Sequence, residues 1–490
     1  MLRTLLSCVA LLLAILFYAR SPSNENTSLP ATYLVPADPS LIRFSVDSQT
    51  KNRVADTTAV ILNWSRKPNV IRIASSLCTD SLLEDTIALV YIWNNSPNQL
   101  SRQDFPLCPE NKLRIYNSPS NLYFQARFIA CTEATTPFCF IQDDDYFILP
   151  EVLSALRSRY SLEHEAGIHL LPPHEALSSH LKRIRVDSKI HTGFAWLGHG
   201  AIIQRNHAVQ FLSLLNLLNA SVEELKMADN YFTLLSNTFP EIWFDQGIEL
   251  GGGQPFTVGE EGNERNRRHI MRATHMLQQI FDCSQPPCIG GSDPPYLILE
   301  ESSSAWIGRA PCLGCPCVLE TSISLLPGGN TQFDASSVTE LLGLEARNLR
   351  SLGDSTREFL NKPLSHAVDG NPVTAFCTSA AKKDDFLLYD LLNPAPQPWD
   401  STELVILTDS PEVIMKGWKF EVNFINGQWV SLTEKVYCTS VFQGSSQTLH
   451  ECHIQAASIA ISKFRLTFHI DTPKRFCIHE LWIRGRRELR

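Results

Sequence analysis

The chain has 490 residues, enough for two or three domains with sizeable cores; 44% of them are hydrophobic and 19% charged, as in a globular protein. Its net charge of −9 argues against a general nucleic-acid binder and offers no basic surface for a membrane. Thirteen of its 14 cysteines follow residue 10, which favours disulfide bonds in an oxidising compartment, with at least one thiol left over or bonded between chains.

The N-terminal segment, residues 1–20, contains an uncharged run from Thr4 to Ala19 followed by Arg20. That length suits either a signal-peptide core or a short span in a thin early-secretory membrane. We expect an uncleaved signal anchor, hence a single-pass protein of the Golgi or ER with a lumenal bulk, and a secreted protein if the segment is cleaved. Residues 21–55 are rich in Ser, Asn and Pro and predict a stem. Four N-glycosylation triplets agree with secretion, beginning at Asn26, Asn63, Asn94 and Asn219.

Short apolar runs alternate with helical patterns after the stem. Strands are predicted at 58–62, 87–93 and 138–141, with helices between them at 69–77 and 121–131. This alternation predicts parallel strands joined by crossover helices, hence a doubly wound α/β domain. The loops that leave the three strands carry Arg66, Asn94–Asn95 and Asp143–Asp145, and we expect them to meet at one edge of the sheet.

The most informative stretch is the strand that ends in Asp143, Asp144 and Asp145. Three adjacent carboxylates are too costly to bury without a countercharge, so they lie in water or on a cation. One interpretation is a divalent metal site that holds a phosphate. The other is a solvated acidic turn before a helix that starts near Pro150.

The second half of this domain has less regular sequence patterns. A glycine-bearing strand is expected over 191–203, a helix over 207–218, and a helix from the capping box at Ser221 to about residue 239. A helix over 264–281 carries six Arg and His side chains. It is either a solvated face or a lid that brings cations onto a diphosphate.

Taken in order, residues 58–280 resemble the exostosin-type glycosyltransferases, glycosyltransferase family 64, which have the GT-A (Rossmann-like) fold. The resemblance rests on pieces that follow the order of the family's motifs: Arg66 after the first strand, Val90-Tyr-Ile-Trp-Asn-Asn95, Asn121 with Arg127, Phe140-Ile-Gln-Asp-Asp-Asp145, Gly198-His-Gly-Ala-Ile-Ile-Gln204, Ala228-Asp229 and the basic helix. The chain departs from the family at Ala228, where an acid is usual, and lacks one Arg of the Asn/Arg helix.

The resemblance implies a retaining, metal-dependent transferase that uses a nucleotide-sugar donor. On this reading Asp145 binds Mn²⁺ or Mg²⁺, and Asp143 or Asp144 orients ribose or sugar hydroxyls. The nucleotide would be held by Arg66, Asn95, Asn121 and Arg127. Asp229 would lie near the anomeric carbon, although a carboxylate that favours a helix N-terminus is the alternative. Either Arg268 or Arg272 would reach the diphosphate, with Arg272 preferred.

A cysteine-rich connector is predicted at 283–330, where Pro and Gly pairs interrupt regular elements. Cys312-Leu-Gly-Cys-Pro-Cys317 resembles half of a zinc site, but no second pair has suitable spacing, so disulfides are favoured. We expect bridges within 283–317 and others among Cys377, Cys438, Cys452 and Cys477.

Residues 331–490 predict an all-β jelly-roll sandwich with little helix after residue 365. Strands are expected at 386–391, 403–407, 418–424, 464–470 and 478–484. Three segments resemble landmarks of discoidin-type (factor V/VIII C-type) domains: Ala367–Phe376, Phe386–Leu391 and Ile478–Gly485. Such domains commonly bind glycans or lipids at loops and also serve as structural accessories.

Two classes of function follow. The first is a membrane-anchored glycosyltransferase that moves a sugar, expected from a UDP-sugar, to a glycan, glycoprotein or glycolipid acceptor. The second is a non-catalytic secreted or cell-surface glycan-binding protein built on a degenerate transferase domain, which Ala228 and the missing Arg favour.

Overall fold

The computed structural model describes residues 41–43 and 54–486, except for 162–165, 178–181, 188, 246, 253–258, 284–295, 299–305, 315, 326–331, 353–355, 380, 393–400, 434–435, 444–447, 457–460 and 472–474. It divides into two units, residues 1–42 and 43–490, and nearly all described residues belong to the second. The expected signal anchor and almost all of the expected stem lie outside the described residues. Among the helices in the described part, none has the length and apolar character needed to span a membrane.

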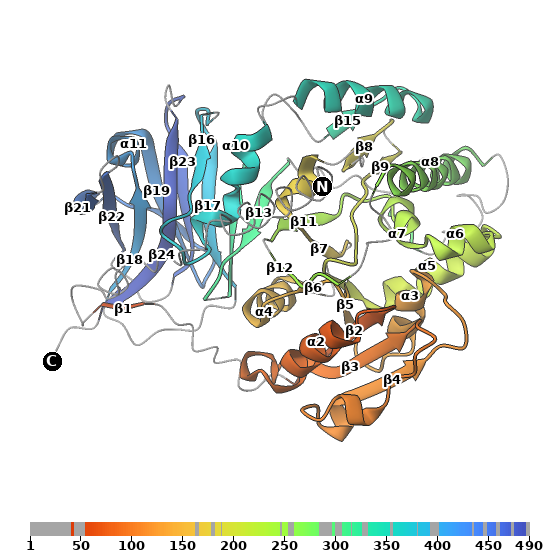
Figure 1. Ribbon diagram of the computed structural model, residues 1–490. Coiled ribbons are helices and arrows are strands. Elements are labelled where there is room, and N and C mark those ends of the chain that lie inside the picture. Colours follow the sequence, from red (N-terminus) through yellow and green to blue (C-terminus); the bar gives the residue numbers. More distant parts are fainter. Residues whose placement is uncertain are drawn as a thin grey trace, which may run out of the picture. The chain divides into compact units, whose positions relative to one another are not determined.

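The larger of the α/β sheets has seven strands in the order β11-β7-β10-β5-β2-β3-β4 (Figure 1). Their bounds are β2 (Thr57–Asn63), β3 (Ile87–Asn94), β4 (Leu113–Asn117), β5 (Phe138–Asp143), β7 (Ile168–Leu171), β10 (Ala201–Gln204) and β11 (Glu241–Phe244). β5, β2, β3 and β4 run parallel, and β10 is antiparallel to both of its neighbours. The three expected strands are therefore confirmed, and the crossover connections account for their shared direction.

Helices cover both faces of this sheet. One core packs α2 (Lys67–Thr79) and α4 (Pro150–Arg159) against it. The other contains α3 (Gln125–Thr132), α5 (Arg205–Leu217), α7 (Asp229–Leu235) and α8 (Glu260–Asp282). Shorter elements of this part are β6 (Tyr146–Phe147), β8 (Arg183–Arg185), β9 (His191–Thr192), β12 (Ile248–Glu249), α6 (Val222–Lys226), η2 (Ser81–Leu83), η3 (Arg102–Asp104), η4 (Glu110–Lys112) and η5 (Pro173–Leu177).

Two expected elements are broken in the structure. Residues 191–203 form β9 and β10 with a glycine-bearing turn between them, because the backbone at Gly198 and Gly200 packs closely against other strands. The helix expected from Ser221 to residue 239 is two helices, α6 and α7. The capping box of Ser221 and Glu224 starts α6, and Met227 leaves helical geometry before α7 begins at Asp229.

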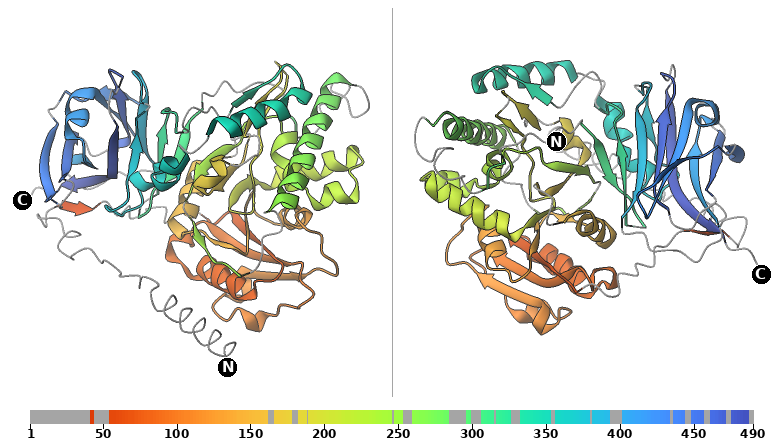
Figure 2. Two further views of the ribbon diagram at one scale, coloured as in Figure 1. Left: turned by 45° about the horizontal axis from the view of Figure 1, so that its top comes forward. Right: turned by 180° about the vertical axis from the view of Figure 1, so that it is seen from behind.

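The C-terminal part is an all-β sandwich, as expected (Figure 2). One sheet has the order β13-β14-β17-β23-β19-β20; the other contains β24-β18-β22-β21, with β16 beside β24. The strands are β13 (Gly308–Pro311), β14 (Cys317–Thr321), β16 (Phe376–Thr378), β17 (Phe386–Leu391), β18 (Ser401–Thr408), β19 (Trp418–Phe424), β20 (Trp429–Ser431), β21 (Tyr437–Gln443), β22 (Thr448–Ala456), β23 (Ile461–Phe468) and β24 (Phe476–Arg486). A single apolar core lies between the sheets.

Two segments lie in elements other than those expected. Part of the proposed connector forms β13 and β14, which join the sandwich. Conversely β15 (Gln332–Asp334), expected in the sandwich, pairs with β8, and residues 333–341 pack into the α/β core. The remaining elements are β1 (Leu41–Arg43), η6 (Val338–Glu340), α9 (Leu341–Leu352), α10 (Thr356–Asn361), η8 (Leu364–Ala367) and α11 (Pro411–Gly417).

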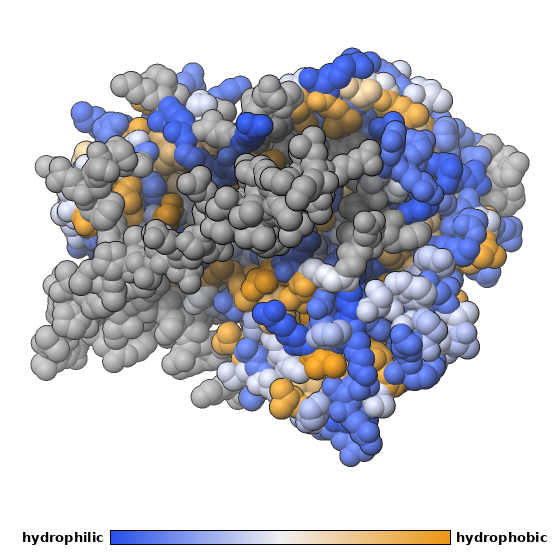
Figure 3. Space-filling model, in the orientation of Figure 1, coloured by the Kyte–Doolittle hydropathy of each residue, from blue (hydrophilic) through white to orange (hydrophobic). Residues whose placement is uncertain are grey.

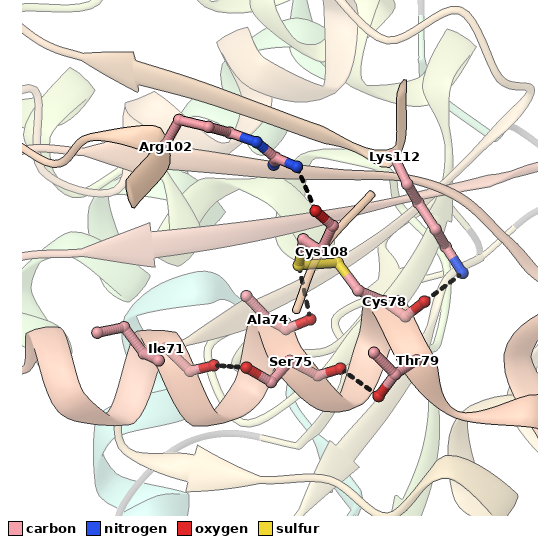
Figure 4. The surroundings of a disulfide bond; sticks show 8 residues. All are labelled: Ile71, Ala74, Ser75, Cys78, Thr79, Arg102, Cys108 and Lys112. Carbon is pink, nitrogen blue, oxygen red and sulfur yellow. Dashed lines mark hydrogen bonds between the residues drawn. A yellow bond between two sulfur atoms is a disulfide. The ribbon is translucent and has the colours of Figure 1, made fainter. Parts of the chain in front are cut away.

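Disulfides occur in both parts. The described pairs are Cys78–Cys108, Cys131–Cys139, Cys312–Cys317, Cys377–Cys477 and Cys438–Cys452. Bridging within 283–317 and among the four C-terminal cysteines is thus confirmed. The two bridges of the α/β part were not anticipated. In Figure 4 the first of these joins α2 to the loop before β4, and Lys112 donates to the carbonyl of Cys78 at 3.3 Å.

Candidate functional site: a carboxylate cluster at the end of β5

The loops after β2 and β5 meet at one edge of the sheet, as the strand pattern predicted. Arg66, three residues beyond β2, donates from Nη1 to Oδ1 of Asp144 at 2.6 Å. The other oxygen of Asp144 lies 3.3 Å from the backbone nitrogens of Trp64 and Arg66. Both oxygens of Asp144 are therefore engaged by the β2 loop, and its side chain is only 4% exposed. Asp144 shapes this edge rather than offering oxygens to a ligand.

Arg127 projects from α3 beneath the same edge and is completely buried. Its Nη2 lies 2.7 Å from Oδ1 of Asp143, and its Nη1 lies 2.7 Å from Oδ2 of Asp229. One guanidinium therefore bridges two carboxylates that are 86 residues apart in the sequence. This fork geometry uses the planar donors of arginine, which a lysine lacks. It also positions Arg127 inside the protein rather than on the surface where a nucleotide would bind.

Gly198 fills a position where no side chain fits. A Cβ at this residue would lie 2.3 Å from Oδ2 of Asp143, and the Gly198 carbonyl accepts a hydrogen bond from the Asp143 backbone at 2.7 Å. The glycine of the Gly-His-Gly motif thus allows the backbone to press against the carboxylate. Arg127 and Gly198 together fix the side chain of Asp143 from two sides.

Asp145 is the most exposed of the three consecutive carboxylates, at 27% of its side chain. Within the described residues its one ion pair is a 3.9 Å contact with Arg66. Burial, and then the charge of Asp143, raise the pKa of Asp145 to about 7. Burial likewise raises the pKa of Asp229 to about 7, against the opposing charge of Arg127. Burial is the main cause of both shifts, and the charge of Asp143 adds to each. The count of charged groups at this edge, four carboxylates against Arg66 and Arg127, leaves a surplus of negative charge.

That surplus fits a divalent cation. The cluster brings together four carboxylates (Asp143, Asp144, Asp145 and Asp229) and two guanidinium groups (Arg66 and Arg127). Its described part contains no group of three or more His, Cys, Asp or Glu side chains arranged as a complete metal site. Mg²⁺ and Mn²⁺ often take one or two carboxylates and complete their shell with phosphates and water, so a single available carboxylate fits this mode. The residue best placed to bind such a cation is Asp145.

Asn95 and Asn121, both expected to hold a nucleotide, shape a loop. The side chain of Asn95 accepts from Trp93 and from the backbone of Leu122, each at 3.2 Å, and donates to the carbonyl of Tyr123. Asn121 accepts from the backbone of Tyr123 at 2.8 Å. These bonds fix residues 121–123 against the end of β3. The structure therefore places both residues at the predicted edge of the sheet, with Asn95 engaged in protein contacts.

The basic helix predicted over 264–281 is α8, and Figure 3 shows a mainly hydrophilic surface in this region. Its Arg272 donates to Glu224 of α6 at 2.9 Å and is half exposed. His269 of the same helix bonds the hydroxyl of Tyr231 in α7 at 2.8 Å. α8 is thereby tied to the helix that begins at Asp229, but no described contact joins Arg272 to the carboxylates of the cluster.

His199 was not anticipated as a notable residue, although it lies within the glycine motif. It is buried, and neither ring nitrogen has a hydrogen-bond partner in the described part of the chain. Asp245 lies 4.0 Å from Nε2, and the ring of Tyr146 packs edge-on at 4.0 Å between centroids. Burial lowers the pKa of His199 to about 3, so the ring is neutral. Only the fold, which places Asp245, directly after β11, beside His199, reveals this pair.

Comparison with known proteins gives limited information. A search against protein-family models finds no match, and a search of curated protein sequences finds none. Among solved structures, CBM32-1 of a family 31 glycoside hydrolase from Clostridium perfringens is 14% identical over 26% of this chain and 85% of its own, with a TM-score of 0.18. An F5/8 type C domain from Bacteroides fragilis is 16% identical over 25% and 80%, with a TM-score of 0.18. TarS 1–349 of S. aureus in complex with UDP-GlcNAc is 13% identical over 46% and 67%, with a TM-score of 0.30. All these scores lie below 0.5, too low to identify a fold family or a function.

Proposed function

We propose that the chain is a glycosyltransferase that binds a nucleotide-sugar, of the UDP class, and transfers the sugar to a glycan, glycoprotein or glycolipid. The observation that carries the proposal is the cluster at the end of β5, where four carboxylates meet two guanidinium groups. A site of this kind attracts a divalent cation and, through the cation, a diphosphate. The motif order that resembles the exostosin-type GT-A enzymes supports the same reading.

Different residues are proposed to bind the metal and the diphosphate. Asp145 would hold Mn²⁺ or Mg²⁺, and Arg66, 3.9 Å from Asp145, would supply a positive charge for the phosphates. When bound, the metal neutralises negative charge that gathers on the departing diphosphate. Asp143 is held by Arg127 and Gly198 with its carboxylate 24% exposed, which suits an acceptor of ribose or sugar hydroxyls.

Asp229 is the proposed carboxylate near the anomeric carbon of a retaining reaction. Its Oδ1 is buried without a hydrogen-bond partner in the described part, while Oδ2 is paired with Arg127. A charge that acts mainly in the transition state affects turnover more than donor affinity. We expect Asp229→Asn to lower turnover about a hundredfold or more with little change in donor affinity. Normal turnover with reduced stability would leave Asp229 a structural partner of Arg127 only.

The remaining assignments complete the proposal. Arg272 reaches the diphosphate only if it leaves Glu224, and Asn121 contacts the nucleotide with the amide nitrogen that the Tyr123 turn does not use. The disulfides favour an oxidising compartment, which agrees with a lumenal domain in the Golgi or ER, anchored by residues 1–20 or secreted after cleavage. The sandwich is an accessory domain of discoidin type.

A second candidate is a glycan-binding protein without catalysis. Ala228 replaces an acid that the resembled family usually has, and both oxygens of Asp144 are occupied within the protein. Such a protein would not cleave a sugar nucleotide. Incubation with a panel of UDP-sugars and Mn²⁺, followed by measurement of UDP release with glycan acceptors and with water, separates the two candidates.

The metal assignment is tested by calorimetric titration of UDP with and without Mn²⁺. We expect Mn²⁺ to strengthen UDP binding in the wild type and Asp145→Asn to remove that gain. Asp282→Asn changes an exposed acid at the end of α8 and serves as the matched control. Equal Mn²⁺-dependent affinity in Asp145→Asn and Asp282→Asn would reject Asp145 as the metal ligand.

A further inference from the structure

The four N-glycosylation triplets of the sequence are not equivalent in the folded chain. Asn63 ends β2 and Asn94 ends β3, and both are buried. The Asn63 amide donates to Asn94 Oδ1 at 2.6 Å, and the Asn94 amide donates to Asn98 and Asn117. A glycan on either nitrogen would break this row of bonds at the sheet edge. The triplet at Asn26 lies outside the described residues.

Asn219 has the opposite surroundings. It is exposed and follows the end of α5 at Leu217. Its φ of +49° lies in the left-handed region, which asparagine tolerates better than most residues and which commonly ends helices. Its side chain makes no hydrogen bond in the described structure, and only its backbone is engaged, with Asn216. The side-chain amide nitrogen of Asn219 is therefore accessible to a modifying enzyme.

The neighbours of Asn219 are compatible with an attached oligosaccharide. Leu217 is 50% exposed and Val222 is 68% exposed, so two large apolar side chains flank the asparagine on the surface. Each of these side chains leaves apolar surface in contact with water. A bulky, well-hydrated oligosaccharide attached between them would shield them and keep the surface soluble.

We propose that Asn219 carries an N-linked oligosaccharide and that Asn63 and Asn94 do not. In the attachment step the Asn219 amide nitrogen forms a bond to the anomeric carbon of an oligosaccharide carried on a lipid diphosphate. The bond from that carbon to the diphosphate oxygen breaks, the lipid diphosphate leaves, and the amide proton passes to a base of the transferring enzyme. This proposal is independent of the transferase assignment, because it rests on none of the residues of the carboxylate cluster.

The structure allows variants that remove the triplet without harming the fold. Asn219→Gly removes the acceptor and keeps the positive φ, which glycine adopts freely. Ser221 is both the third triplet residue and the N-cap of α6, where its Oγ accepts from the backbone of Glu224 at 3.3 Å. Ser221→Asp destroys the triplet and keeps a good capping oxygen. Asn216→Gln, an exposed change on α5 outside any triplet, is the matched control.

The experiment expresses the full chain in eukaryotic secretory cells and compares mobility before and after digestion with a peptide N-glycosidase. We expect Asn219→Gly and Ser221→Asp each to lack one glycan relative to the wild type and Asn216→Gln. Mass spectrometry of the digested wild type should find aspartate at position 219. Ser65→Ala and Ser96→Ala, which disable the other two triplets, should leave the glycan number unchanged. Wild-type mobility of both position-219 and position-221 variants, or loss of a glycan in Ser65→Ala or Ser96→Ala, would overturn the proposal.

Discussion

Arg127 is expected to be the most sensitive residue of the cluster. Its guanidinium is 0% exposed and lies 2.7 Å from both Asp143 and Asp229. Arg127→Met keeps a long apolar side chain but leaves two carboxylates without their countercharge. Breaking a buried ion pair by removing one partner costs about 3–5 kcal/mol. We expect a loss of that size in the free energy of unfolding, measured by urea denaturation at pH 8.

The pH dependence of that loss tests its electrostatic origin. Without Arg127 the pKa values of both carboxylates rise further, so the folded variant binds protons more readily than the unfolded chain. The loss in the free energy of unfolding should therefore be smaller at pH 5 than at pH 8. Adding Asp143→Asn and Asp229→Asn to Arg127→Met should recover part of the stability. Arg114→Met breaks an exposed pair with Glu133 and should cost at most about 1 kcal/mol. A loss in Arg127→Met at pH 8 no larger than in Arg114→Met, or a loss that does not become smaller at pH 5, would refute the reasoning.

Three further outcomes are expected. Removing the Cys131–Cys139 bridge by Cys131→Ala with Cys139→Ala should cost about 2.5 kcal/mol in chemical denaturation, from the entropy of the short loop it closes; an unchanged midpoint would show that packing alone holds α3 on β5. Gly198→Ala should displace Asp143 and weaken Mn²⁺-UDP binding at least about tenfold by calorimetry. Gly343→Ala on α9 is the control. Equal affinity for Mn²⁺-UDP in Gly198→Ala and Gly343→Ala would contradict a role for the close approach of Gly198 to Asp143. Because His199 is buried, its pKa falls from 6.5 to about 3, so its contribution to stability is present above pH 6.5 and lost as the pH falls towards 3. His199→Gln should therefore lose less stability than the wild type when the pH is lowered from 7.5 to 5, measured as the change in melting temperature. An equal change in the two proteins would argue against a buried neutral ring.

The strands that build the cluster were predictable because each has a strong local signal. β2, β3 and β5 are short apolar runs that stop at polar residues, and parallel pairing then places their ends together. Short apolar runs separated by turn signals likewise predicted the main strands of the sandwich. The sequence alone therefore predicted that Arg66 and Asp143–Asp145 lie at one edge of the sheet.

Other features depend on contacts between distant residues and leave no local signal. The bridge from Arg127 to Asp229 spans 102 positions, and nothing near either residue shows that both are buried. β13 and β14 were missed because Pro, Gly and Cys around 311–317 indicate irregular structure, whereas the Cys312–Cys317 bridge closes a tight turn between them. β15 joins β8 across 147 positions of sequence, a pairing that neither three-residue strand specifies alone.

The most direct test of a metal-dependent nucleotide site is the position of the cation itself. Crystals grown with MnCl₂ and UDP, measured at the manganese absorption edge, would give an anomalous peak at each bound ion. A peak bonded to a carboxylate oxygen of Asp145 and to the diphosphate is the predicted result. UDP bound at this edge without an adjacent manganese peak, or manganese bound elsewhere on the protein, would contradict the proposed site.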